Sequence, residues 1–252
     1  MIAIIGTAGW AIPRGEAARF PAEGTGLERY ARRLGGVEVN SSFYRPHRGS
    51  TWARWAASVP ADFRFSVKIP KAITHEAKLV GADAAIAQFC SEVEGLGPKL
   101  AVLLVQLPPR LAFDEAVCRA FFPTLRAHST AARIVCEPRN PSWFTEHADG
   151  VLSDLRVARV GADPALSEEA ARPGGWRGFR YRRLHGSPAM YRSPYSSEAL
   201  AGYAGQIAAE LAEGVESWCI FDNTVTGAAL GDALALEAAI RDADRARTRR
   251  RG

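Results

Sequence analysis

The chemically richest stretch of the chain is Glu137-Pro-Arg-Asn-Pro-Ser-Trp143, which follows the apolar run Ile134-Val-Cys136. The run has the length and the β-branched content of a buried strand, and the two prolines behind it prevent an immediate helix. Polar groups this dense at the end of a buried strand need partners or solvent, so they predict a site. The alternative is a structural ion pair between Glu137 and Arg139 beneath a loop.

Eight strand-like runs recur along the chain, and each is followed by sequence of helical character. Their carboxyl ends lie about 23–38 residues apart, which is the spacing of a strand, a crossover helix and a loop. Several runs are apolar almost throughout, as parallel strands covered on both faces are. The runs are Ile2–Gly6, Val37–Asn40, Phe63–Ile69, Leu100–Leu107, Arg133–Glu137, Val157–Gly161, Phe179–Leu184 and Trp218–Phe221.

Eight alternations within 252 residues predict the α/β class and a single (β/α)₈ TIM barrel. A doubly wound open sheet is the alternative, but Gly6-Thr-Ala-Gly9 after the first run is not its phosphate-binding fingerprint. Helical periodicity is clearest at 197–213, where Leu200, Ala204 and Ile207 share a face, and Ser196 or Ser197 would cap this helix. Residues 1–240 are predicted to form this one domain, because no linker or repeat divides them.

Residues 241–252 are predicted to be a basic, disordered tail. They hold six arginines and two aspartates, or +4 of the net charge of +5. Such a tail can bind nucleic acid, but its composition is also that of a solvated terminus. The rest of the chain has no basic stripe that would extend a nucleic-acid-binding surface.

The remaining composition indicates a cytoplasmic protein. No apolar run approaches the 18 residues of a membrane span, and the N-terminus enters a strand without a basic leader. The four cysteines are widely spaced, so neither a disulfide framework nor a cysteine zinc site is expected. The oligomeric state is left open.

Polar side chains gather at the carboxyl ends of the runs, which share one face of a barrel and form its usual active site. Alternation along the second run puts Glu38 and Asn40 on one face and the two valines on the other, so the polar pair is expected to point inward. Lys68 follows the same parity in the third run.

Three kinds of chemistry are compatible with these ends. In the first, Glu38 and Glu137 form a metal-free acid–base pair, in which a neighbouring cation keeps one carboxylate ionised while burial raises the pKa of the other. In the second, a divalent metal serves an isomerase or a phosphodiesterase. Its ligands would be Glu137, Asp163, His185 and Asp222, although the two aspartates are also suited to a turn and a helix cap. In the third, Lys68, Arg139, Arg183 and His185 bind an anionic metabolite or nucleic acid without catalysis.

These residues resemble the YecE-like proteins, a TIM-barrel family known as domain of unknown function 72. The resemblance runs from Gly6-Thr-Ala-Gly-Trp10 to about Ala235 and includes Glu38-Val-Asn-Ser-Ser-Phe-Tyr44, Phe63-Arg-Phe-Ser-Val-Lys-Ile-Pro70, Ile73-Thr-His75, Leu103-Leu-Val-Gln-Leu-Pro-Pro109, Glu137-Pro-Arg-Asn-Pro-Ser-Trp143, Arg183-Leu-His-Gly186 and Phe221-Asp-Asn223. It implies the barrel and supplies no reaction.

Two positions depart from the family pattern. Asn140 stands where a histidine usually precedes Pro-Ser-Trp, and Asp222 stands where the family usually has asparagine. Asn140 cannot act as a base, so a mechanism that needs the histidine is in doubt. An amide at position 222 in relatives weakens the metal interpretation.

The sequence therefore predicts a polar pocket at the carboxyl face and cofactor-free acid–base chemistry, as in a hydrolase, lyase or isomerase, on a carbohydrate-like or phosphorylated small molecule. Glu137 is the first choice for the acid or base. The residues assigned to catalysis are Glu137, Glu38, Lys68, Arg139 and His185. The residues assigned to substrate binding are Asn40, Tyr44, His75, Gln106, Trp143, Tyr191 and Asn223.

Overall fold

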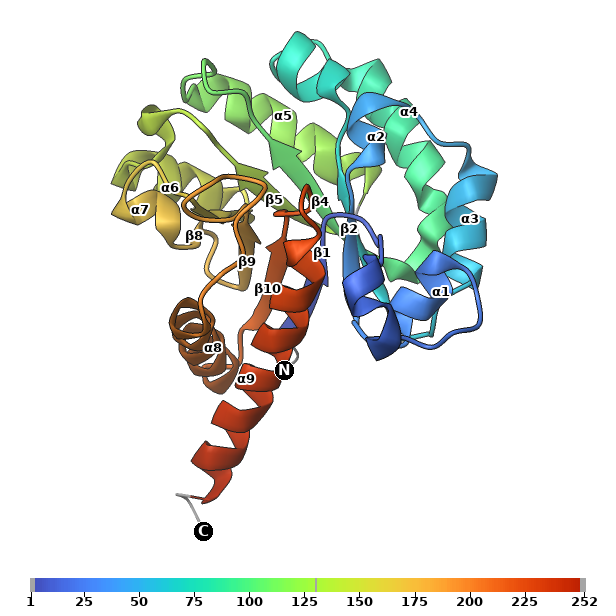
Figure 1. The fold of residues 1–252 in the computed structure, drawn as a ribbon. Helices are drawn as coiled ribbons and strands as arrows, with labels where there is room; N and C mark the ends of the chain where they lie inside the picture. The colour runs from blue at the N-terminus through green and yellow to red at the C-terminus, as the bar shows by residue number, and fades with distance from the viewer. Residues whose placement is uncertain (1–2, 130, 250–252) are drawn as a thin grey trace.

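The computed structural model describes residues 3–129 and 131–249, and it has an α/β fold built on parallel strands with helices around them (Figure 1). The strands are β1 (Ala3–Thr7), β2 (Gly36–Val39), β3 (Arg64–Lys68), β4 (Leu100–Gln106), β5 (Arg133–Glu137), β6 (Val157–Arg159), β7 (Gly161–Asp163), β8 (Gly174–Gly175), β9 (Phe179–Leu184) and β10 (Glu216–Phe221). Each predicted run thus overlaps a strand, and the ends differ by a few residues.

The α-helices are α1 (Gly26–Ala31), α2 (Ser41–Tyr44), α3 (Gly49–Ala57), α4 (Asp83–Val93), α5 (Glu115–His128), α6 (Glu146–Asp154), α7 (Glu168–Ala171), α8 (Ser197–Ala212) and α9 (Ala228–Arg249). Short 3₁₀ helices η1 (Arg14–Arg19), η3 (Glu94–Lys99) and η4 (Pro141–Trp143) and a π-helix η2 (Ala72–Glu76) lie between them. Side-chain caps start several helices, and Ser196 caps α8 as predicted by accepting from the Ala199 amide.

Helix α9 continues through Arg249, so the segment predicted to be a disordered tail from residue 241 is helical over most of its length. The i,i+4 pair between Glu237 and Arg241, 2.8 Å apart, carries the helix across the predicted boundary. The composition of residues 241–252 is that of a frayed end, but composition does not show which charged residues pair along a helix. Residues 250–252 lie outside the described residues.

The strands form two sheets whose order follows the chain. One sheet has the order β2-β3-β4-β5-β6-β8, and the other has β1-β10-β9-β7. All pairs are parallel except β6 with β8, and the first strand lies beside the last, with Thr7 opposite Phe221. A doubly wound sheet reverses its strand order part-way, so this sequential order does not match it.

A tyrosine hydroxyl separates β1 from β2. Tyr30 accepts a hydrogen bond from the Thr7 amide (2.9 Å) and donates to the Gly36 carbonyl (3.0 Å), and so it takes up groups that a ladder would pair. One bridge, Ala8 with Glu38, still joins the strands. The described residues thus show the predicted α/β class, with two mainly parallel sheets.

The sixth predicted strand is also divided. Residues 157–159 pair with β5, whereas residues 161–163 pair with β9. The reason is that β8 occupies the other edge of β6 in antiparallel fashion. Gly175 permits this approach, because a Cβ there would lie 2.6 Å from the Val157 carbonyl oxygen. The two-residue β8 was not predicted.

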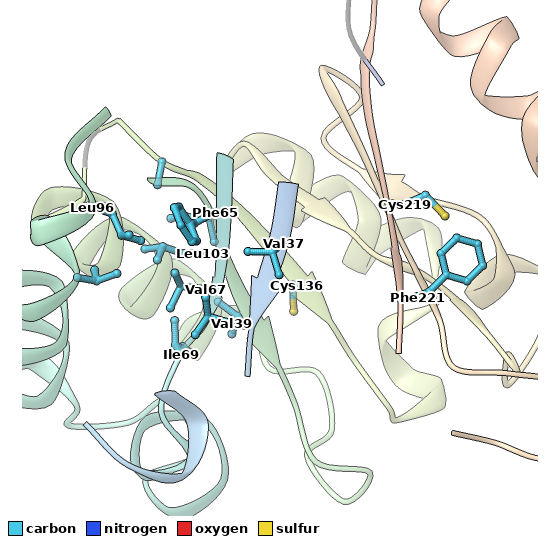
Figure 2. Packing of buried hydrophobic residues seen from close by; sticks show 14 of the residues in the cluster. Val37, Val39, Phe65, Val67, Ile69, Leu96, Leu103, Cys136, Cys219 and Phe221 are labelled. Atoms are coloured by element: carbon cyan, nitrogen blue, oxygen red, sulfur yellow. The ribbon is translucent and has the colours of Figure 1, made fainter. Parts of the chain in front are cut away.

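Apolar side chains pack on both faces of the strands. Val37, Phe65 and Leu103 point toward the helix layer, where Figure 2 shows them together. A second cluster contains Tyr181, Trp218 and Ile220 and lies on the opposite face of the strands. The parity expected for β2 is thus confirmed, since Val37 joins the helix-side core while Glu38 contacts Tyr181. No described helix is long and apolar enough to cross a membrane.

Candidate functional site

A buried guanidinium is the centre of the candidate site. Arg183 is the fifth residue of β9, and its side chain is 2% exposed. Its Nη2 lies 2.7 Å from Glu38 Oε1 and 2.8 Å from Asp222 Oδ2, and its Nη1 lies 2.6 Å from Glu137 Oε2. Strands β2, β5 and β9 and the residue after β10 therefore meet at one cation, which the planar fork of arginine suits.

Glu38 is held by a second polar contact. Tyr181 OH lies 2.8 Å from Glu38 Oε2 and 2.8 Å from Ser66 Oγ. Because a carboxylate only accepts, Tyr181 donates to Glu38 and leaves Ser66 to donate to the phenol oxygen. The indole of Trp218 stacks on Tyr181 at 6.0 Å between ring centroids. Glu38 is thus fixed from the strand side as well as by Arg183.

The two glutamates are counter-ions of Arg183. Both are 0% exposed. Burial raises the pKa of Glu137, but Arg183 and Arg139 outweigh burial and hold this pKa well below its usual value of 4.5. Glu137 therefore stays ionised near neutral pH and has no proton to donate. Glu137 is therefore excluded only as the acid of the predicted pair with Glu38, and the arginine that the two carboxylates share was not predicted from the sequence.

His185 joins two of the carboxylates and is 0% exposed. Its Nδ1 lies 3.1 Å from Asp222 Oδ2, and its Nε2 lies 3.1 Å from Glu137 Oε1 and 2.8 Å from Arg139 Nη2. Nε2 therefore lies between the guanidinium of Arg139 and the carboxylate of Glu137, and the imidazole bridges these groups to Asp222. His185 therefore positions Asp222 and Arg139 and does not face solvent.

Arg139 is closer to the surface than Arg183. Its side chain is 18% exposed, and Nη2 also donates to Glu137 Oε1. Its Nε is buried and has no hydrogen-bond partner among the described residues. The predicted ion pair between Glu137 and Arg139 is present, and the guanidinium keeps an unused donor.

Lys68 ends β3 and is half-buried. Its Nζ lies 4.0 Å from the centroid of the Phe43 ring, and no hydrogen bond or ion pair joins it to another described residue. Burial is the main reason that its pKa falls from 10.5 to about 8, and the nearby charge of Arg183 adds to the effect. The carboxylates of Glu137 and Glu38 oppose this decrease without cancelling it. The inward direction predicted for Lys68 agrees with these electrostatic neighbours.

Three predicted substrate-binding residues lie around Lys68. Asn40 caps no amide with its side chain, and its buried Oδ1 has no partner among the described residues. His75 packs edge-on against Phe43 at 5.0 Å, and burial and Lys68 lower its pKa. Tyr44 is 73% exposed and lines a cavity of about 190 Å³ with Phe43, Pro70 and Phe89, so it faces a neighbouring groove.

Two further predicted residues lie near Arg139 and His185. Tyr191 is 40% exposed, packs edge-on against His185 at 5.5 Å and has a left-handed backbone (φ 65°). Burial raises its pKa, while the charge of Arg139 lowers it. Gln106 is paired with Glu137 in the sheet and donates to the Leu107 carbonyl (2.6 Å). Both remain candidates for contact with a ligand.

Two others have structural roles. Trp143 is 1% exposed, packs edge-on against Phe113 and donates to the Leu111 carbonyl, so its predicted stacking on a substrate is wrong. Asn223 is 0% exposed and donates to Asp232 and to the Ser193 carbonyl. It therefore ties the loop after β9 to α9. The position of Trp143 in the polar stretch, and that of Asn223 after a strand end, did not reveal that both side chains turn into the protein.

The alternative metal ligands do not form one cluster. Asp163 accepts from Tyr195 OH at 2.7 Å, whereas Glu137 and Asp222 contact Arg183. A guanidinium thus occupies the position between the carboxylates that a cation would take. No group of three potential metal-binding side chains was found among residues 3–129 and 131–249.

Sequence reasoning missed Tyr181 and gave Arg183 only the role of holding an anion. The alternation of Phe179-Arg-Tyr-Arg-Arg-Leu184 carried a usable signal, because Phe179, Tyr181 and Arg183 share one face. Phe179 and Tyr181 belong to the inner cluster, so this face pointed away from the helices.

The family model described as "Protein of unknown function DUF72" matches residues 4–251. This chain belongs to the DUF72 family. The UPF0759 protein YecE of Escherichia coli strain K12 is 32% identical to it over 153 residues, which are 59% of this chain and 56% of YecE. The match thus spans just over half the length of that relative. The resemblance to YecE-like proteins is confirmed.

Solved structures of the family share the fold. A DUF72 family protein of Enterococcus faecalis superposes with a TM-score of 0.78 at 19% identity, covering 95% of this chain and 96% of that one. A DUF72 family protein of Thermotoga maritima gives 0.77 at 22% identity, covering 96% and 100%. At these identities the likeness concerns the fold alone.

Proposed function

We propose that this chain is a metal-free enzyme that binds a small anionic molecule and uses Lys68 as its general base. The carrying observation is a half-buried lysine amine with no ionic partner among the described residues, at the carboxyl end of β3. Its pKa of about 8 leaves roughly a tenth of the amine neutral at pH 7, whereas a lysine of pKa 10.5 leaves less than a thousandth neutral. Lys68 thus replaces Glu137 as the candidate base.

The surrounding charges support an anionic substrate. Glu38 and Glu137 both contact Arg183, and Arg139 adds a second positive charge beside Glu137, so the two carboxylates repel an anion less than free carboxylates would. Arg139 keeps a buried Nε donor without a partner, and guanidinium donors bind carboxylate and phosphate groups well. Tyr191 and Gln106 lie on the same side as Arg139 and would bind the polar part of a carbohydrate-like or phosphorylated molecule in a pocket at this face.

A closed TIM barrel is the architecture that we infer for this site. β1 is paired with β10, the Gly9 amide donates to the Glu38 carbonyl at 2.8 Å, and the Val160 amide donates to the Cys136 carbonyl at 2.8 Å. These contacts support closure of the two sheets into one ring, with Tyr30 as an insertion in it. Residues 1–240 would then be one domain. The four buried thiols support a reducing, cytoplasmic location.

Two measurements test the function. Isothermal titration with inorganic phosphate and with small sugar phosphates tests binding. Proton NMR in D₂O tests whether the protein exchanges carbon-bound protons of a ligand that binds. The matched variants are Lys68→Arg, which keeps the charge but removes a base that can be neutral near pH 8, and Lys71→Arg, which changes an exposed lysine paired with Glu76.

We expect Lys68→Arg to retain binding and to lose exchange at least tenfold, because the fraction of neutral base falls by far more than that. Lys71→Arg should leave both unchanged. Exchange at the parent rate in Lys68→Arg would remove Lys68 from the chemistry. Binding that weakens steeply with salt and is never followed by exchange would favour the alternative, a non-catalytic binder of anions or nucleic acid.

A further inference from the structure

We infer that Lys68 forms a covalent imine with the carbonyl group of a small molecule that also carries a carboxylate or a phosphate. This inference rests on the proposed function and names its substrate class. It starts from the position of the amine, which lies against the face of Phe43 and has no ion pair or hydrogen bond with another described residue. An amine that is ion-paired with a carboxylate stays protonated and has no free lone pair, whereas the Lys68 amine has no such partner among the described residues.

The chain makes Lys68 distinctive among its cations. Only four of the 32 lysines and arginines are lysine, and arginine cannot add to a carbonyl because it stays protonated. The other three amines have different surroundings. Lys71 is paired with Glu76 at 3.1 Å, Lys78 is exposed, and Lys99 donates to the Ala56 and Val59 carbonyls at 2.6 Å. Lys68 alone among these four combines partial burial with a free amine.

The neighbourhood would also hold the rest of such a molecule. The guanidiniums of Arg139 and Arg183 both contact Glu137, and of these two side chains only that of Arg139 is partly exposed. Arg139 would bind the anionic group through its free Nε donor, while the Lys68 amine lies over the ring face of Phe43, 4.0 Å from its centroid. A depressed amine pKa follows from the same surroundings and increases the neutral, nucleophilic fraction.

The reaction balances without a further reagent. The neutral amine adds to the carbonyl carbon, the C=O π bond breaks, and a proton moves from nitrogen to oxygen to give a carbinolamine. Loss of that oxygen as water, with one proton taken from solvent, leaves a protonated imine. The imine then acidifies the neighbouring C–H bonds, and this links the adduct to the proton transfer proposed above.

Reductive trapping tests the imine directly. The protein is incubated with pyruvate or dihydroxyacetone phosphate, reduced with sodium cyanoborohydride, digested and sequenced by mass spectrometry. We expect the reduced adduct at Lys68 at least tenfold above that at Lys71, Lys78 or Lys99. Inorganic phosphate should compete with its formation. Acetone, which lacks the anionic group, should give at least tenfold less adduct at Lys68.

Lys68→Arg should abolish the adduct but retain phosphate binding, and Lys71→Arg should change neither. Adducts spread evenly over the four lysines, or no adduct at Lys68 with either probe, would overturn the imine. If phosphate binding and proton exchange still depend on Lys68 in that case, the proposed function stands without the covalent step. If phosphate does not bind the parent protein, the proposed function itself fails.

Discussion

Replacing Lys68 with methionine removes a charge from a half-buried position and keeps an unbranched side chain against Phe43. The pKa of Lys68 falls from 10.5 to about 8 on folding, and this difference corresponds to at most about 3 kcal/mol at 1.36 kcal/mol per pH unit. We therefore expect Lys68→Met to increase the free energy of unfolding at pH 7 by about 1–3 kcal/mol. For a domain of this size the melting temperature rises by about 2–4 °C per kcal/mol.

The pH dependence gives the sharper test. Between pH 8 and 10.5 the unfolded parent chain binds a proton at Lys68 that the folded chain has released, so the stability of the parent rises with pH across this window. Lys68→Met lacks this increase, and its advantage should be full below pH 8 and gone by about pH 10.5. Other titrating groups are common to both proteins and cancel in the difference.

Urea unfolding of the parent, Lys68→Met and Lys71→Met at several pH values from 7 to 10.5 measures this difference. Lys71 is exposed, so its replacement should change stability by no more than about 0.5 kcal/mol. A Lys68→Met protein that is less stable than the parent at pH 7 would refute the reasoning. So would an advantage that stays constant across the pH window.

Three further predictions concern the ion cluster and the C-terminal segment. Arg183→Met should lower the free energy of unfolding at pH 7 by about 3–5 kcal/mol, measured with urea, because three carboxylates lose their cation. Adding Glu38→Gln and Glu137→Gln should restore part of this stability. No restoration would contradict the assignment of Arg183 as the shared counter-ion. The low pKa of Glu137 contributes stability above pH 4.5 that is lost on acidification. The urea midpoint of Glu137→Gln should therefore fall less steeply with decreasing pH than the midpoint of the parent. An equal fall would contradict the low pKa of Glu137. Deleting residues 241–252 should leave phosphate affinity unchanged by calorimetry, and a large loss would move anion binding to this segment.

The sequence predicted the strand positions well because buried parallel strands leave a local signal, a short apolar run between turn residues. It also predicted which face of β2 points inward, since alternation follows from two adjacent residues. The sheet division at Tyr30 was not predictable in this way, because one hydroxyl reaches backbone groups 23 residues before it and 6 residues after it. Such a contact leaves no periodic trace.

The same limit applies to the site. Lys68 and Arg139 could be nominated from their strand ends, but their different environments depend on which cation neutralises the glutamates. That cation is Arg183, which lies 145 residues from Glu38 and 46 residues from Glu137 in the sequence. Trp143 shows the converse error, because a residue beside the polar stretch turned toward Leu111 and Phe113 instead.

The ion cluster also makes a shifted pairing of β9 energetically unfavourable. A slip of β9 by one residue in one direction would place Leu184 among three carboxylates, and a slip in the other would place Arg183 in the buried apolar position of Leu184. Either error buries charge without a partner, which is strongly destabilising. Because Asp222 follows the last strand, the cluster is complete only once β10 has joined. The charges that hold the site thus also specify the register of β9, which apolar packing alone would specify less strictly.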